Sequence, residues 1–77
     1  MLKIALTDRN GNPKVGHELF VELKGRTGTN GKTDSSGVFE IDFRGPETVE
    51  KVTCYGDVLH NHSLVMRSGD TLSLVYR

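Results

Sequence analysis

Apolar and polar residues alternate in several short stretches of this chain. A period of two is typical of a β-strand with one buried face, because successive side chains point to opposite sides of a sheet. The alternation is strongest in residues 2–6, 17–24, 38–43 and 71–76. The apolar residues that we expect to face inward in these stretches are Leu2, Ile4, Leu6, Leu19, Val21, Leu23, Phe39, Ile41, Phe43, Leu72, Leu74 and Tyr76.

Segments rich in Gly, Asn, Asp and Pro interrupt the alternation and predict turns. Residues 8–13 form the first such segment, and the glycine-rich residues 25–34 favour a hairpin loop or an irregular sheet edge. Weaker patterns predict further strands over residues 48–55 and 58–66. The whole pattern predicts an all-β fold, an antiparallel sandwich or small barrel of about six or seven short strands.

Composition limits the classes of protein to which the chain can belong. Its 77 residues suit one domain, 1–77, with a core of modest size. Ten Lys and Arg balance ten Asp and Glu, so no net charge attracts a nucleic acid or an anionic membrane. Cys54 is the only cysteine, which excludes an internal disulfide. Neither a membrane-spanning apolar run nor a signal peptide is present, so we expect a cytoplasmic protein, or an excised domain of an exported parent protein.

The stretch LHNHSLVM, residues 59–66, raises the question of a metal site. His60 and His62 share one face of the expected strand and could reach the same ion, with His17 or Cys54 as a third ligand. One hypothesis is therefore a small metal-binding or catalytic protein that uses His17, His60 and His62. The alternative is that these histidines line the edge or rim of a strand and hold no metal.

Other chemical motifs are weak or absent. The string RTGTNGKT, residues 26–33, is close to a phosphate-binding loop, but a strand rather than a helix is expected after it. Lys24, Arg26 and Lys32 could bind an anion weakly. No hydrolase, zinc-protease or redox motif is present, so we expect a protein that is not an enzyme and needs no cofactor.

Several motifs occur in an order that resembles a known family. Gly11, Pro13 and Gly16 precede the second expected strand, and the stretch TDSSGVF, residues 33–39, leads into the strand expected over residues 38–43. This order resembles the carboxypeptidase regulatory-like, transthyretin-like (prealbumin-like) domains. The resemblance implies a small Ig-like, transthyretin-like antiparallel β-sandwich of Greek-key type. In it, Asp34 would form an Asx turn and Gly37 would take a positive φ.

The resemblance also implies a role. Domains of this family are commonly accessory modules of larger proteins, so the expected function is a noncatalytic protein-interaction or assembly module. A related group hydrolyses hydroxyisourate, but the Gly-Ser of its closing signature does not follow Tyr76 and Arg77. The partner would be another protein or a second copy of the chain, bound at a sheet edge or through the outward apolar residues Phe20, Tyr55 and Val75.

Overall fold

The computed structural model describes residues 1–43 and 45–77, which contain eight β-strands and no helix. None of these residues therefore forms a helix that is long and apolar enough to cross a membrane. The strands are β1 (Leu2–Thr7), β2 (Glu18–Leu23), β3 (Arg26–Lys32), β4 (Val38–Ile41), β5 (Glu47–Cys54), β6 (Asp57–His60), β7 (Leu64–Met66) and β8 (Thr71–Val75).

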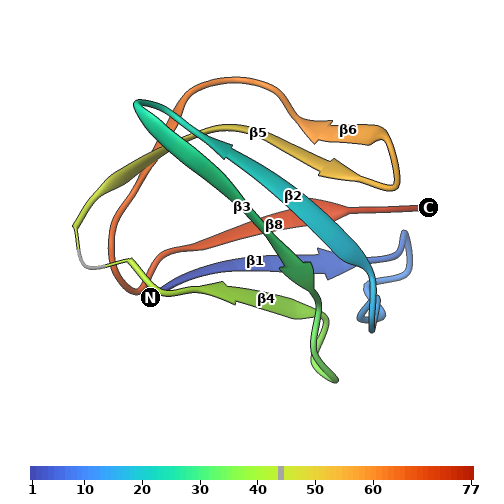
Figure 1. The fold of residues 1–77 in the computed structure, drawn as a ribbon. Helices are drawn as coiled ribbons and strands as arrows, with labels where there is room; N and C mark the ends of the chain where they lie inside the picture. Colours follow the sequence, from blue (N-terminus) through green and yellow to red (C-terminus); the bar gives the residue numbers. More distant parts are fainter. Residues whose placement is uncertain (44) are drawn as a thin grey trace.

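The strands form two sheets, and Figure 1 shows β2 and β3 crossing in front of β1 and β8. One sheet has the order β4-β1-β8, and the other has the order β3-β2-β5-β6, with β7 also paired to β5. Every named pair is antiparallel except β1 with β8, which is parallel. The expectation of an antiparallel fold therefore holds for most of the structure, and the parallel pair is an addition that alternation cannot reveal.

The two sheets share one hydrophobic core. The inward residues expected from alternation in β1 and β2 are all buried, and Ile41 and Leu74 are buried with them. Phe39, Phe43, Leu72 and Tyr76 are partly buried against the same core. Side chains from the inner faces of both sheets thus pack together, and the arrangement fits a β-sandwich.

The glycine-rich segment forms a strand, not a loop. β3 lies at the edge of the larger sheet and pairs with β2 through a register shift, so the expected irregular edge is confirmed and the alternative of a hairpin loop is wrong. Gly31 explains part of this composition, because a Cβ atom there would collide with the ring of Phe39 from the other sheet. The small residue lets the ring of Phe39 lie against the β3 backbone.

The single strand expected over residues 58–66 is two strands, so that prediction is wrong. β6 pairs with β5 between Val52 and Cys54, and β7 pairs with β5 between Glu47 and Val49. The chain leaves the sheet between these two segments, where His62 and Ser63 are exposed. A continuous period of two therefore does not extend from one strand to the next.

The turn before β4 has the geometry expected from the sequence. The Asp34 Oδ1 atom accepts hydrogen bonds from the backbone amides of Ser36 and Val38, at 2.8 and 3.1 Å. Gly37 has a φ of 74°, a conformation that glycine adopts without a side-chain clash. The turn returns the chain to the sheet so that Phe39 points toward the core.

Candidate functional site

The outer face of the larger sheet carries a row of three neighbouring side chains. Phe20 of β2 is paired with Thr53 of β5, and Thr53 is paired with Val58 of β6. Because Leu19 and Val21 are buried, Phe20 points away from the core. Phe20 and Val58 are 51% and 49% exposed. We call Phe20, Thr53 and Val58 the outer row.

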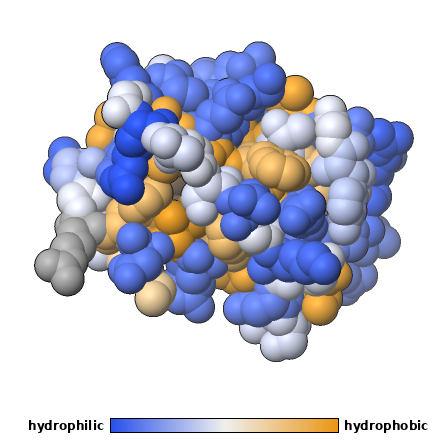
Figure 2. All heavy atoms as spheres, viewed as in Figure 1, coloured by the Kyte–Doolittle hydropathy of each residue, from blue (hydrophilic) through white to orange (hydrophobic). Residues whose placement is uncertain are grey.

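The three side chains expected to mediate interactions do not form one patch. Tyr55 is 59% exposed and lies two residues after Thr53, close to the outer row. Val75 is 58% exposed, but it follows the buried Leu74 in β8 and therefore faces outward from the smaller sheet. The structure thus brings Phe20 and Tyr55 to one side and places Val75 on another. Figure 2 shows one face of the molecule, where apolar atoms are visible in separate places among hydrophilic side chains.

Tyr55 occupies a tight turn between β5 and β6. Tyr55 and Gly56 have φ values of 48° and 84°, and they are the two residues between the ends of the paired strands. Positive φ at both positions is the geometry of a type I′ turn, which matches the twist of a two-residue hairpin. The turn that joins β5 to β6 lies at the end of the larger sheet, at the right in Figure 1.

Three rings from distant parts of the chain gather at this end. The His17 ring centroid lies 5.5 Å from that of Tyr55 and 5.7 Å from that of Tyr76. The two tyrosine rings are 6.4 Å apart. These are separations at which tilted aromatic rings attract each other. His17 therefore takes part in an aromatic cluster formed by the loop before β2, the β5–β6 turn and the residues after β8.

Asp57 links this cluster to a positive charge. Its Oδ2 atom accepts a hydrogen bond from the Tyr76 hydroxyl at 3.1 Å and forms an ion pair with the Arg77 guanidinium at 2.7 Å. The hydrogen bond from Arg77, followed by that from Tyr76, lowers the pKa of the Asp57 carboxyl. Desolvation and the bond to Asp57 raise the pKa of the Tyr76 hydroxyl. The contacts of Asp57 thus favour its ionised form and the protonated form of Tyr76.

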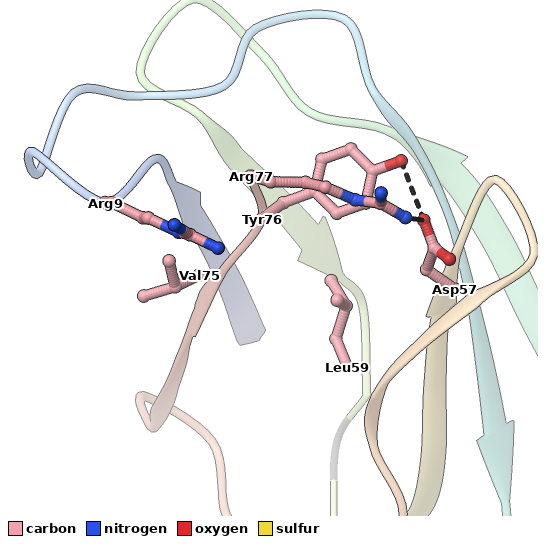
Figure 3. A pocket seen from close by; sticks show the side chains of 6 residues that line it. All are labelled: Arg9, Asp57, Leu59, Val75, Tyr76 and Arg77. Carbon is pink, nitrogen blue, oxygen red and sulfur yellow. Dashed lines mark hydrogen bonds and ion pairs between the residues drawn. The ribbon is translucent and has the colours of Figure 1, made fainter.

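A groove opens beside these residues. Figure 3 shows Tyr76 and Arg77 converging on Asp57, with Leu59 below them and Arg9 next to Val75 at the left. This hollow has a volume of about 290 Å³, and a second hollow of about 390 Å³ also has Arg9 and Arg77 in its lining. We call the two together the end groove. Its lining residues are Asp8, Arg9, Asn10, Lys14, Asp57, Leu59, Val75, Tyr76 and Arg77.

The histidine pair lies in another environment. The His60 and His62 ring centroids are 4.1 Å apart, and the His60 Nε2 atom lies 2.7 Å from the backbone carbonyl oxygen of His62. A carbonyl oxygen only accepts, so the ring nitrogen in this bond carries a proton and cannot ligate a metal at the same time. His17 contacts Tyr55 and Tyr76 instead, and residues 1–43 and 45–77 contain no group of three potential ligands that could hold a metal ion.

The structure also shows the surroundings of the expected basic segment and of the single cysteine. Arg26 forms a 2.7 Å ion pair with Glu47 and lies over the Phe43 ring, so one of the three cations of the expected basic segment is already engaged. Cys54 is buried in β5, and this burial raises the pKa of its thiol. Its reactive thiolate form is therefore disfavoured.

Comparison of the chain with models of known protein families and with curated proteins gave no match. The family resemblance of the sequence is therefore a prediction that these comparisons do not test. Functional proposals for this chain depend on its own residues and their geometry.

Sequence reasoning missed most of the end groove. Arg9, Leu59 and Arg77 lie in three separate segments, and no local motif connects them. Leu59 is the extra residue of a register shift in β6, because Val52 pairs with His60 and Thr53 pairs with Val58. A usable signal was the Tyr55-Gly56 pair, since glycine in a two-residue hairpin would have placed Asp57 at the start of a strand.

Proposed function

We propose that the chain is a noncatalytic interaction module that associates with a second copy of itself through the outer row. The observation that supports this function is the register of β2, β5 and β6, which puts Phe20, Thr53 and Val58 side by side on a solvent-facing surface. An exposed aromatic ring beside a β-branched side chain is a suitable centre for a protein interface, in which aromatic residues are enriched.

Charge is the reason for choosing a second copy as the partner. The chain has a formal net charge of zero, so two copies do not repel each other at long range. Two cross-strand pairs of opposite charge lie on either side of Phe20 in β2, Glu18 with Lys32 and Glu22 with Lys51. A twofold axis can bring acidic groups of one copy to basic groups of the other, whereas a strongly charged partner would meet both signs.

The size of the surface sets the expected strength. A stable interface buries about 800 Å² on each partner, and the whole chain exposes 4674 Å². The outer row provides only the centre of such an interface. We therefore expect weak association, with a Kd on the order of 0.1 mM, and fast exchange between monomer and dimer.

Sedimentation velocity over about 0.01–1 mM protein tests this proposal around the expected Kd. The wild-type chain should sediment faster as its concentration rises, and Phe20→Lys should remain monomeric because a buried lysine charge opposes the contact. Val75→Lys is the matched control, since Val75 is 58% exposed, against 51% for Phe20, but faces outward from the other sheet. Its association should equal that of wild type.

Two results would refute the proposed interface. One is a wild-type chain that stays monomeric throughout this range. The other is a dimer that Phe20→Lys leaves intact while its circular dichroism spectrum stays native. A dimer that only Val75→Lys disrupts would move the interface to the smaller sheet and would equally contradict the proposal.

We further propose that the sandwich has the Ig-like, transthyretin-like Greek-key arrangement that the sequence resemblance implies. Two features support it, the Asx turn of Asp34 and the positive φ of Gly37. Both belong to the stretch TDSSGVF, which carries the closest resemblance to that family. An accessory domain with this architecture needs no catalytic residues of its own, in agreement with a noncatalytic role.

A further inference from the structure

We propose that the end groove binds a small organic anion, in which a carboxylate or phosphate group is attached to an apolar body. This site is separate from the outer row, and the inference does not depend on self-association. It rests on three features of the groove, namely its cations, its carboxylates and its apolar floor.

The cations of the groove have unused hydrogen-bonding capacity. Arg9 and Lys14 come from the loop after β1, and Arg77 follows β8. Within residues 1–43 and 45–77, neither the Arg9 guanidinium nor the Lys14 ammonium forms a hydrogen bond or an ion pair with a side chain or the backbone. A guanidinium offers paired N–H donors that fit the two oxygens of a carboxylate or phosphate.

The two carboxylates of the groove, Asp8 and Asp57, are already engaged by hydrogen-bond donors. They offset two of the three positive charges of Arg9, Lys14 and Arg77, so the groove keeps one net positive charge. The Asp8 Oδ1 atom accepts hydrogen bonds from the backbone amides of Asn10 and Asn12, at 2.8 and 2.9 Å. Asp57 Oδ2 accepts hydrogen bonds from the Tyr76 hydroxyl and the Arg77 guanidinium. Each carboxylate therefore closes a loop or a turn, and an incoming anion can still bind to Arg9, Lys14 and the remaining N–H groups of Arg77.

The hollow of about 290 Å³ has an apolar part, which we call the floor of the groove, and for this reason the ligand should carry more than a charge. Leu59 and Val75 line the hollow from the two edge strands β6 and β8, and the Tyr76 ring lies above Leu59 in Figure 3. Leu59 and Tyr76 are only partly buried against the core. The hollows of about 290 and 390 Å³ meet at Arg9 and Arg77, so a ring or short aliphatic body can lie on the floor while its anionic group reaches Arg9.

A titration followed by backbone amide NMR shifts tests the site with three probes. Phenyl phosphate contains both the oxyanion and the apolar body, inorganic phosphate contains only the oxyanion, and benzyl alcohol contains only the apolar body. We expect saturable shifts with phenyl phosphate, confined to residues 8–14, 57–59 and 75–77. Inorganic phosphate and benzyl alcohol should each bind about tenfold more weakly, because each lacks one half of the contacts.

The variants test whether Arg9 holds the anion. Arg9→Gln should weaken phenyl phosphate binding about tenfold, because it removes the charge and the paired donors. Arg67→Gln is the matched control, since Arg67 is an exposed arginine in the turn between β7 and β8 and does not line the groove. Phe20→Lys should bind like wild type, so failure of self-association and failure of this site can be distinguished.

Three outcomes would overturn the proposal. The first is a phenyl phosphate titration without saturation, or with shifts spread over all basic residues. The second is equal affinity for inorganic phosphate, which would show that the floor contributes nothing. The third is equal affinity in Arg9→Gln and Arg67→Gln, which would show that any surface arginine serves as well.

Discussion

Replacement of Gly31 by alanine probes the contact between the two sheets. Gly31 lies in β3 of the larger sheet, and the Phe39 ring that covers it belongs to β4 of the smaller sheet. A Cβ atom at residue 31 would lie 2.8 and 3.1 Å from the Cζ and Cδ1 atoms of that ring, and closer still to its Cε1 atom. Ordinary carbon contacts are about 3.5–4.0 Å, so the ring must move by roughly 1 Å.

The expected loss follows from the position of the ring. Phe39 packs on the core and pairs with Ile4, so it moves only at the expense of its neighbours, and such overpacking costs about 1–3 kcal/mol. Alanine has less conformational freedom than glycine in the unfolded chain, and this difference stabilises the folded state by about 0.5–1 kcal/mol. We expect Gly31→Ala to lower the free energy of unfolding by about 1–2 kcal/mol, a large share of the roughly 4–12 kcal/mol typical for this chain length.

Urea unfolding followed by far-ultraviolet circular dichroism measures this loss. With a slope of about 1 kcal/mol per molar urea, the midpoint should fall by about 1–2 M. Gly45→Ala is the control, because no atom lies within 4 Å of the added Cβ. Its midpoint should stay within about 0.5 M of wild type.

A double variant separates the ring contact from a general effect of alanine in β3. Phe39→Leu removes the ring atoms that would collide, so Gly31→Ala should cost about 1 kcal/mol less in the Phe39→Leu background than in wild type. Equal costs in the two backgrounds would refute the contact. A Gly31→Ala midpoint equal to that of Gly45→Ala would do so as well.

Two further predictions concern titratable groups. Because hydrogen bonds from Arg77 and Tyr76 lower the pKa of Asp57 below its usual 3.8, the ionised carboxylate stabilises the fold above that pH, and this contribution is lost as the pH falls through the lower folded value. Asp57→Asn should therefore reduce the urea midpoint at neutral pH, and the difference from wild type should shrink below pH 3.8. A difference that stays constant with pH would contradict a stabilisation by the ionised carboxylate. Burial raises the pKa of Cys54, so iodoacetamide should alkylate it slowly in the native chain and much faster in urea, and equal rates would show that the thiol is accessible.

Alternation was a good guide where one face of a strand is buried against the core. β2 shows why, since Leu19, Val21 and Leu23 point inward while Phe20 and Glu22 are exposed. The period of two reflects burial directly in such a strand. The same rule applies to β1, in which Leu2, Ile4 and Leu6 are fully buried.

Alternation predicted no strand for residues 26–32, because neighbouring strands, and not a buried apolar face, determine which residues fit in β3. β3 obtains its hydrogen-bonded partner from β2, and its inner face must leave room for Phe39. Gly28 has a comparable constraint, since its Cβ atom would lie 2.5 Å from the backbone oxygen of Val21. Glycine in these positions reflects close approach of neighbouring atoms, which local strand propensity cannot detect.

The end groove was beyond sequence reasoning for a related reason. Its floor includes Leu59, the extra residue of a register shift in β6, and its charge depends on a loop arginine, Arg9, that lines the same hollows as Arg77. Neither feature produces a periodic pattern or a motif in the sequence. Both require knowledge of which strand ends meet, which only the three-dimensional structure provides.

Tyr55 connects these observations to function. A type I′ turn favours Asn or Gly, and a left-handed conformation costs other residues about 1–2 kcal/mol, yet the chain has an exposed tyrosine with a φ of 48° there. The fold would gain from asparagine at this position. Places where a residue opposes the local requirements of the fold are often places of function. The Tyr55 ring lies against His17, between the outer row and the end groove, and this supports locating the interactions of the chain at this end of the molecule.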